Sequence, residues 1–137
     1  MTWTHKEMIN KLSRLSGNYG FNLRSTTKFQ LMDVQYDPDV VWEIADKIVI
    51  FEIETNPNIG RKVVSGEITL SNSVSIHQNK QIDLIIEVPY KQSWDVVNSR
   101  WNLYRTDHPD RTKNMKVKSL VVTSLDELDG LLKIALT

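Results

Sequence analysis

The chain has 137 residues, of which 40% are hydrophobic and 25% are charged, and these values are typical of one globular domain. Its 17 basic residues balance its 17 acidic residues, so charge alone does not indicate a nucleic-acid-binding protein. The absence of cysteine excludes disulfides, thiolate zinc sites and a cysteine nucleophile.

The domain organisation is expected to be simple. No repeat, low-complexity tract or flexible linker interrupts the sequence, so we expect residues 1–137 to form a single domain. No segment has the apolar core of a signal peptide or the length of a membrane-spanning helix. We therefore predict a soluble, cytoplasmic protein with no membrane partner.

The first half of the chain predicts one helix and three strands. A helix is expected over residues 4–16, where Thr4 and Glu7 form a capping box. The apolar residues of this segment recur at helical spacing, at Met8, Ile9, Leu12 and Leu15. Strands are expected over residues 21–32, 39–44 and 47–55.

The second half alternates helices and strands. A helix is permitted over residues 60–76, although Gly66 and several serines weaken it. The later elements are a strand at 82–88, a helix at 93–105 with Ser93 as its N-cap, a strand at 117–123 and a last helix capped by Ser124. The order αβββαβαβα predicts an α/β fold with a mixed β-sheet flanked by helices on both faces.

The hairpin of residues 39–55 carries the candidate functional residues. A two-residue turn at Ala45 and Asp46 places Asp39 opposite Glu52, with their β-carbons roughly 5 Å apart. Glu54 lies two residues beyond Glu52 and therefore shares its face of the sheet. The spacing thus predicts three carboxylates close together at the end of an apolar strand.

Carboxylates this close repel each other, and a divalent cation would offset the repulsion. Mg²⁺ or Mn²⁺ is the expected cofactor, because hard cations bind carboxylate oxygens and water. The alternative is a solvent-facing strand end without a metal, since a one-residue shift in register would separate Asp39 from Glu52.

Pro38 and Asp39, followed after twelve intervening residues by Glu52-Ile53-Glu54, resemble the motif of the PD-(D/E)xK nucleases. That superfamily includes restriction endonucleases and Holliday-junction resolvases, and its order of elements matches the predicted order over essentially the whole chain. The resemblance implies a restriction-endonuclease-like fold and a magnesium-dependent endonuclease acting on DNA. The protein would then be an enzyme that hydrolyses phosphodiester bonds, with a homodimer as a plausible form.

The resemblance also implies roles for individual residues. Asp39 and Glu52 correspond to metal ligands, and Glu7 to an outer metal ligand, although its place in the capping box explains it equally well. Glu54 stands where the family has lysine and would order or deprotonate water. Lys62 could supply the missing cation, or could simply be a solvated lysine at the start of a helix.

Basic residues suggest where DNA would bind. The expected contacts are Arg24, Lys28, Arg61, Lys62, Arg111 and Lys113, with solvated loops as the simpler explanation for the last two. The missing lysine and the neutral charge also fit a nuclease-like domain that no longer cuts and serves nucleic-acid binding or protein interaction. A structural or assembly protein, which would bind no metal, is the third class. The histidines at 5, 77 and 108 are expected to be surface residues without a ligand role.

Overall fold

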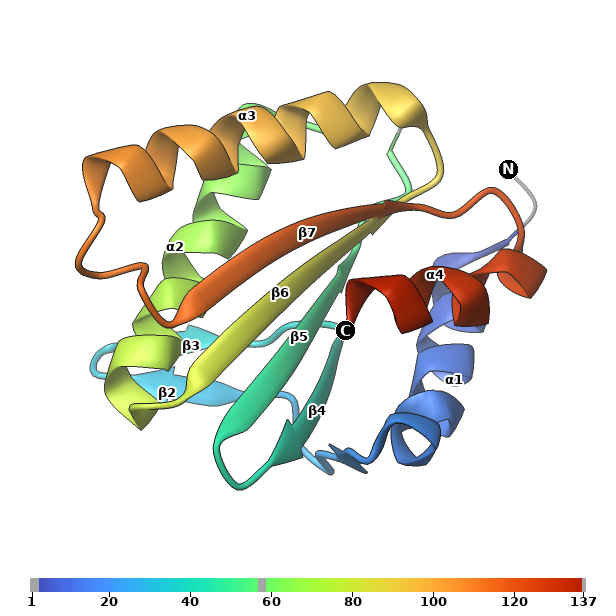
Figure 1. Cartoon of the computed structure of the whole chain (residues 1–137), viewed down its shortest axis with the longest axis horizontal. Helices are drawn as coiled ribbons and strands as arrows, with labels where there is room; N and C mark the ends of the chain where they lie inside the picture. The colour runs from blue at the N-terminus through green and yellow to red at the C-terminus, as the bar shows by residue number, and fades with distance from the viewer. Residues whose placement is uncertain (1–2, 57–58, 137) are drawn as a thin grey trace.

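A mixed β-sheet forms the centre of the computed structural model, which describes residues 3–56 and 59–136 (Figure 1). The strand order is β1-β4-β5-β6-β7, where β5, β6 and β7 run parallel and β4 pairs antiparallel with both β1 and β5. The strands are β1 (Asn22–Leu23), β4 (Val40–Ile44), β5 (Lys47–Ile53), β6 (Gln81–Val88) and β7 (Met115–Val121). The predicted mixed sheet is confirmed.

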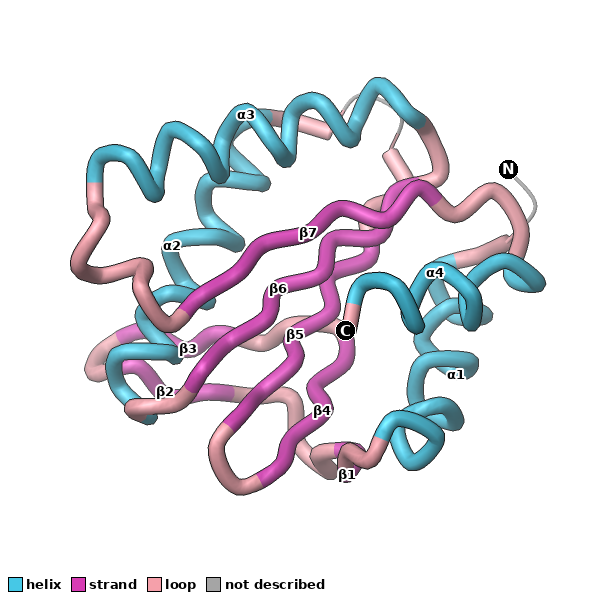
Figure 2. Tube along the Cα trace, viewed as in Figure 1, coloured by secondary structure: helices cyan, strands magenta, loops and turns pink. Residues whose placement is uncertain are grey.

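Helices cover both faces of the sheet, as predicted. They are α1 (His5–Leu15), α2 (Arg61–Gln78), α3 (Lys91–Asp107) and α4 (Leu128–Ala135). Side chains of α2 and α3 form one apolar core with one face of the sheet, and side chains of α1 and α4 form a second core with the other face. A separate hairpin of β2 (Phe29–Leu31) and β3 (Val34–Tyr36) lies beside α2 (Figure 2).

The predicted turn and register of the main hairpin are confirmed. Ile44 pairs with Lys47 and Val40 with Phe51, so Ala45 and Asp46 form the turn. The alternation of side chains then places Trp42 on the α1 and α4 side of the sheet. Its indole donates to the carbonyl of Leu12 at 3.1 Å, and its ring packs edge-on against Phe51.

The single strand predicted over residues 21–32 is wrong. Only Asn22 and Leu23 pair with β4, and the chain then leaves the sheet before forming the β2–β3 hairpin. The cause lies in Phe29 and Leu31, which are both buried in the core beside α2. Burial of these two apolar side chains outside the main sheet overrides the loose alternation of the sequence.

The helix expected at Ser93 begins two residues earlier, at Lys91. Ser93 is buried within the first turn and does not cap the helix, because Tyr90 occupies the N-cap position. The buried face therefore runs through Ser93, Val97 and Trp101, and Trp94 is 41% exposed. The first and second helices agree well with their predicted bounds.

The second helix tolerates its small polar residues because they form buried hydrogen bonds. Ser71 is fully buried against the hydroxyl of Tyr36, and Asn72 donates to the carbonyl of Arg111 at 2.7 Å. These contacts tie α2 to the β2–β3 hairpin and to the segment that precedes β7. Tertiary contacts thus compensate for the weak helix propensity of the segment.

No helix within the described ranges is both long and apolar enough to cross a lipid bilayer.

Removal of the buried indole should destabilise the fold strongly. We expect Trp42→Ala to lower the free energy of unfolding by about 3–5 kcal/mol, because it opens a cavity and removes a buried hydrogen bond. Urea unfolding followed by circular dichroism measures this change. The matched control Trp94→Ala removes a partly exposed indole and should cost less than about 1 kcal/mol. Equal losses for the two variants would contradict the assignment of the two tryptophans.

Candidate active site

Five acidic side chains gather where β5 and β6 end. Parallel strands present their carboxyl ends at one edge of a sheet, and this edge carries Glu52, Glu54 and Glu87. Asp39 joins them because it directly precedes β4, which runs antiparallel to β5. Glu67 is contributed by α2, which returns over the sheet from this edge.

Asp39 and Glu52 are neighbours, as the register predicts. The backbone amide of Asp39 donates to Oε1 of Glu52 at 3.2 Å, and the amide of Ile53 donates to Oδ2 of Asp39 at 2.8 Å. Each carboxylate therefore accepts a hydrogen bond from a backbone amide on the opposite side of the hairpin. These two hydrogen bonds offset part of the repulsion between the carboxylates, for which the sequence alone suggested a divalent cation.

Tyr36 fixes the second oxygen of Glu52. Its hydroxyl lies 3.0 Å from Oε2 of Glu52 and 3.2 Å from the hydroxyl of Ser71. A phenol has one proton to give, so Tyr36 donates to Glu52 and accepts from Ser71. Burial and the charge of Glu52 raise the pKa of Tyr36, which keeps it protonated as a donor.

Glu52 and Glu67 are neighbouring buried acids on the α2 side of the sheet. Burial is the largest cause that raises the pKa of each, and for Glu67 the adjacent carboxyls of Glu54 and Glu52 raise it further. One proton held between neighbouring carboxyls relieves the repulsion in the absence of a cation. Oε1 of Glu67 is buried and has no hydrogen-bond partner.

Glu87 occupies the other face of the same edge. It lies two residues after Ile85, which packs with α1 and α4, so the two side chains share that face of the sheet. Glu87 is completely buried, and neither of its side-chain oxygens has a hydrogen-bond partner. Burial, followed by the nearby charge of Asp39, raises the pKa of Glu87 to about 8. The charge of Asp39 also raises the pKa of Glu52, so it acts on acids of both faces of the sheet.

His5 is the other residue that reaches Asp39. Its Nε2 lies 3.1 Å from Oδ1 of Asp39, and its side chain is 46% exposed. His5 is exposed, as the sequence predicted, and its contact with Asp39 is an addition to that prediction. Helix α1 begins at this residue, so the contact also fixes the start of α1 at the acidic edge.

Two other predicted site residues form no hydrogen bond or ion pair with the acids within the described part of the chain. Glu7 accepts the amide of Thr4 at 2.9 Å, and the complete capping box explains its position. Lys62 is exposed in the first turn of α2. Ion pairs among the described residues link His5 with Asp39 and Lys47 with Asp83, so none brings a lysine or an arginine to this edge.

The predicted DNA contacts divide between the two edges of the sheet. Arg61 and Lys62 follow the acidic edge directly, and Arg24 lies 4.1 Å from the ring of Phe29, which stacks on Tyr36. Lys28 precedes Phe29 and accepts a bond from Arg24 through its carbonyl. Arg111 and Lys113 precede β7 and thus lie at the opposite edge, remote from the acids.

The donor set fits a hard divalent cation in its chemistry. It consists of carboxylate oxygens, and buried oxygens of Glu67 and Glu87 have no hydrogen-bond partner. Within residues 3–56 and 59–136, however, no three or more His, Asp or Glu side chains are arranged as a ready metal site. The carboxylates bond instead to backbone amides and to Tyr36, and binding would require them to exchange these partners.

Sequence reasoning missed Glu67, Glu87, Tyr36 and His5. One pattern could have revealed Glu87, because it is an acid near the carboxyl end of a largely apolar strand and parallel pairing brings strand ends together. The other three come from separate elements and meet the hairpin only through tertiary packing.

Comparison with known proteins supports the fold and leaves the chemistry open. A scan against protein-family models found no match, and a search of curated proteins found none either. A crystal structure described as "Protein of Unknown Function AF1548" is similar, with a TM-score of 0.54 and 14% sequence identity. The match covers 97% of this chain and 79% of that chain, and at this identity it supports the α/β architecture alone.

The raised pKa of Glu87 should make the stability of the fold depend on pH. The pKa of Glu87 is raised in the fold, so its stabilising contribution is complete below about pH 4.5 and is lost as the pH rises to about 8. Between pH 5 and pH 8 the wild-type protein should lose about 3–5 kcal/mol of unfolding free energy through Glu87, and Glu87→Gln should not show this loss. Urea unfolding in EDTA at several pH values measures the slope of unfolding free energy against pH for each protein.

A matched control for that experiment is Asp107→Asn, which changes an exposed acid at the end of α3. It should keep the wild-type slope. An unchanged slope for Glu87→Gln would contradict the raised pKa.

Proposed function

We propose that this chain is a metal-dependent nuclease that hydrolyses phosphodiester bonds of DNA, with a restriction-endonuclease-like fold of the PD-(D/E)xK type. The observation that carries the proposal is the contact of Asp39 with Glu52 at the end of β5, beside the buried acid Glu67. The spacing of Asp39, Glu52 and Glu54 resembles the family motif. The mixed sheet with helices on both faces is compatible with the family's order of elements.

The chain's residues would divide the work at this edge. Asp39 and Glu52 would hold Mg²⁺ or Mn²⁺, with Glu67 as a further carboxylate ligand in place of the predicted Glu7. A bound divalent cation supplies a polarised water and stabilises the charge that develops at phosphorus. Tyr36 holds Glu52 in a fixed orientation, and Glu54, which is only partly buried, would accept a proton from water. Arg61 and Lys62 would contact the phosphates that flank the site.

Loss of the central aspartate should abolish cleavage. We expect the wild-type protein to cut branched or linear plasmid DNA with Mg²⁺ or Mn²⁺, and Asp39→Asn to reduce the rate by at least about 100-fold. Gel electrophoresis of time courses measures the cut fraction. Asp107→Asn is the control and should retain the wild-type rate. Cleavage that persists in Asp39→Asn would reject the site, and no wild-type cleavage in either metal would reject the nuclease.

The acid on α2 should contribute to metal affinity. We expect calorimetric titration to detect binding of Mn²⁺, and Glu67→Gln to weaken it by about 10-fold or more, because one carboxylate ligand is lost. Circular dichroism and urea unfolding of the same variant verify that the fold is kept. Equal affinity in Glu67→Gln and wild type would exclude Glu67 as a ligand.

A domain that binds nucleic acid or a protein without cutting is the second candidate. It is favoured by Glu54, which stands in the family's lysine position, and by the ion pairs described above, which bring no lysine to the acids. Mn²⁺ binding and DNA binding without cleavage would support this candidate over the nuclease.

A further inference from the structure

The imidazole of His5 brings a nitrogen donor to the acidic edge. Its Nε2 atom lies 3.1 Å from Oδ1 of Asp39, and the two side chains are 46% and 24% exposed. The other oxygen of Asp39, Oδ2, already accepts the amide of Ile53 at 2.8 Å. Oδ1 is therefore the oxygen of Asp39 that remains available to a cation, and the imidazole lies directly beside it.

The separation of these two atoms suits a shared metal ion. Two donors at adjacent positions of an octahedral cation, each about 2.1 Å from it, lie about 3 Å apart. His5 and Asp39 therefore already have the spacing of neighbouring ligands. The same spacing also describes a hydrogen bond, so the distance alone does not decide between an ion pair and a metal site.

The acids around this contact favour the metal. No ion pair within the described residues brings a lysine or an arginine to them. Glu67 is only 8% exposed, and its Oε1 atom has no hydrogen-bond partner. Glu52 links Glu67 to Asp39, because its carboxyl interacts with both residues. A bound cation would offset the charge of these acids and give the buried oxygen of Glu67 a partner.

The fold holds His5 in place from both sides of the sequence. Thr4 and Glu7 complete a capping box around the first turn of α1, so the helix begins at His5. Two residues earlier, the buried indole of Trp3 donates to the carbonyl of Val122 at 2.6 Å. The side chain is held in turn by its contact with the acid. A donor fixed in this way needs little reorganisation to bind a metal.

We propose that His5 is a nitrogen ligand of the metal ion held by Asp39, and that it makes the site prefer Mn²⁺ and Co²⁺ to Mg²⁺. The inference rests on the metal site of the proposed nuclease. Mg²⁺ favours oxygen donors and water, so it gains little from an imidazole. First-row transition metals bind a site with a nitrogen donor more tightly, and the gain increases from Mn²⁺ to Co²⁺. His5 thus determines which cation the acids select.

Calorimetric titration of the whole chain with Mg²⁺, Mn²⁺ and Co²⁺ measures this preference. We expect the wild-type protein to bind Mn²⁺ more tightly than Mg²⁺. His5→Gln replaces the nitrogen with an amide oxygen, so it should weaken Mn²⁺ by about tenfold and Co²⁺ by more, and change Mg²⁺ affinity by less than about threefold. Circular dichroism verifies that the variant folds.

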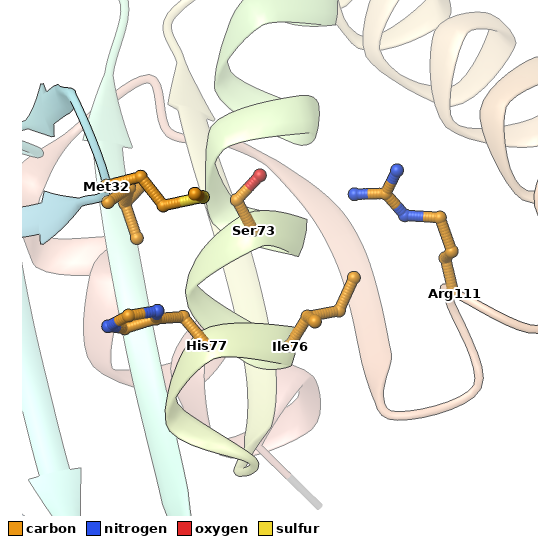
Figure 3. A pocket seen from close by; sticks show the side chains of 6 residues that line it. Met32, Ser73, Ile76, His77 and Arg111 are labelled. Carbon is orange, nitrogen blue, oxygen red and sulfur yellow. The ribbon is translucent and has the colours of Figure 1, made fainter.

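The matched control is His77→Gln, which changes an exposed histidine near the end of α2. Figure 3 shows His77 extending from this helix below Met32. Ten residues separate it from Glu67, so it lies about 15 Å along the helix from the acids. This variant should keep the wild-type affinity for all three cations.

Pulsed electron paramagnetic resonance of bound Mn²⁺ gives a readout that a purely structural role of His5 would not change. A coordinated imidazole produces a nitrogen modulation of the Mn²⁺ echo, which we expect in the wild type and in His77→Gln and not in His5→Gln at saturating Mn²⁺. Bound Mn²⁺ without this modulation in the wild type, or an unchanged ratio of Mn²⁺ to Mg²⁺ affinity in His5→Gln, would overturn the role of His5 and leave the proposed nuclease standing. No Mn²⁺ binding by the wild type would overturn both.

Discussion

Like charges held together at the end of β5 are the constraint around which this fold is organised. Strand pairing places Asp39 beside Glu52, and parallel pairing adds Glu87 on the opposite face. Repulsion and burial would make this edge costly if every acid were ionised. The structure relieves it with two backbone amides, the hydroxyl of Tyr36 and raised pKa values, which favour the neutral, protonated form of the buried acids.

The main hairpin could be predicted from sequence because its information is local. The turn at Ala45 and Asp46, the β-branched residues of β5 and the alternation of Trp42 with its neighbours fix one register between adjacent segments. That register alone brings Asp39 to Glu52. The same local reasoning identified α1 with its capping box and the parallel strands that follow.

The remaining parts of the site depend on tertiary packing and could not be predicted in the same way. Tyr36 reaches Glu52 only because Phe29 and Leu31 pack beside α2 and draw the β2–β3 hairpin away from the main sheet. The sequence of residues 21–32 resembles one strand, and nothing local marks where it breaks. His5 and Glu67 likewise reach the acids through the docking of α1 and α2, which is determined by burial over the whole domain.

The hydrogen bond from the amide of Ile53 to Asp39 has a practical consequence. This backbone proton lies at the end of a strand that is buried on both faces, and its acceptor is a side chain whose charge any bound ion would alter. Its resonance frequency and its rate of exchange with solvent deuterium should therefore respond to the ionic state of the whole acidic edge. One peptide group of the main chain thus serves as an internal reporter, which can be observed without labelling or altering any of the acids.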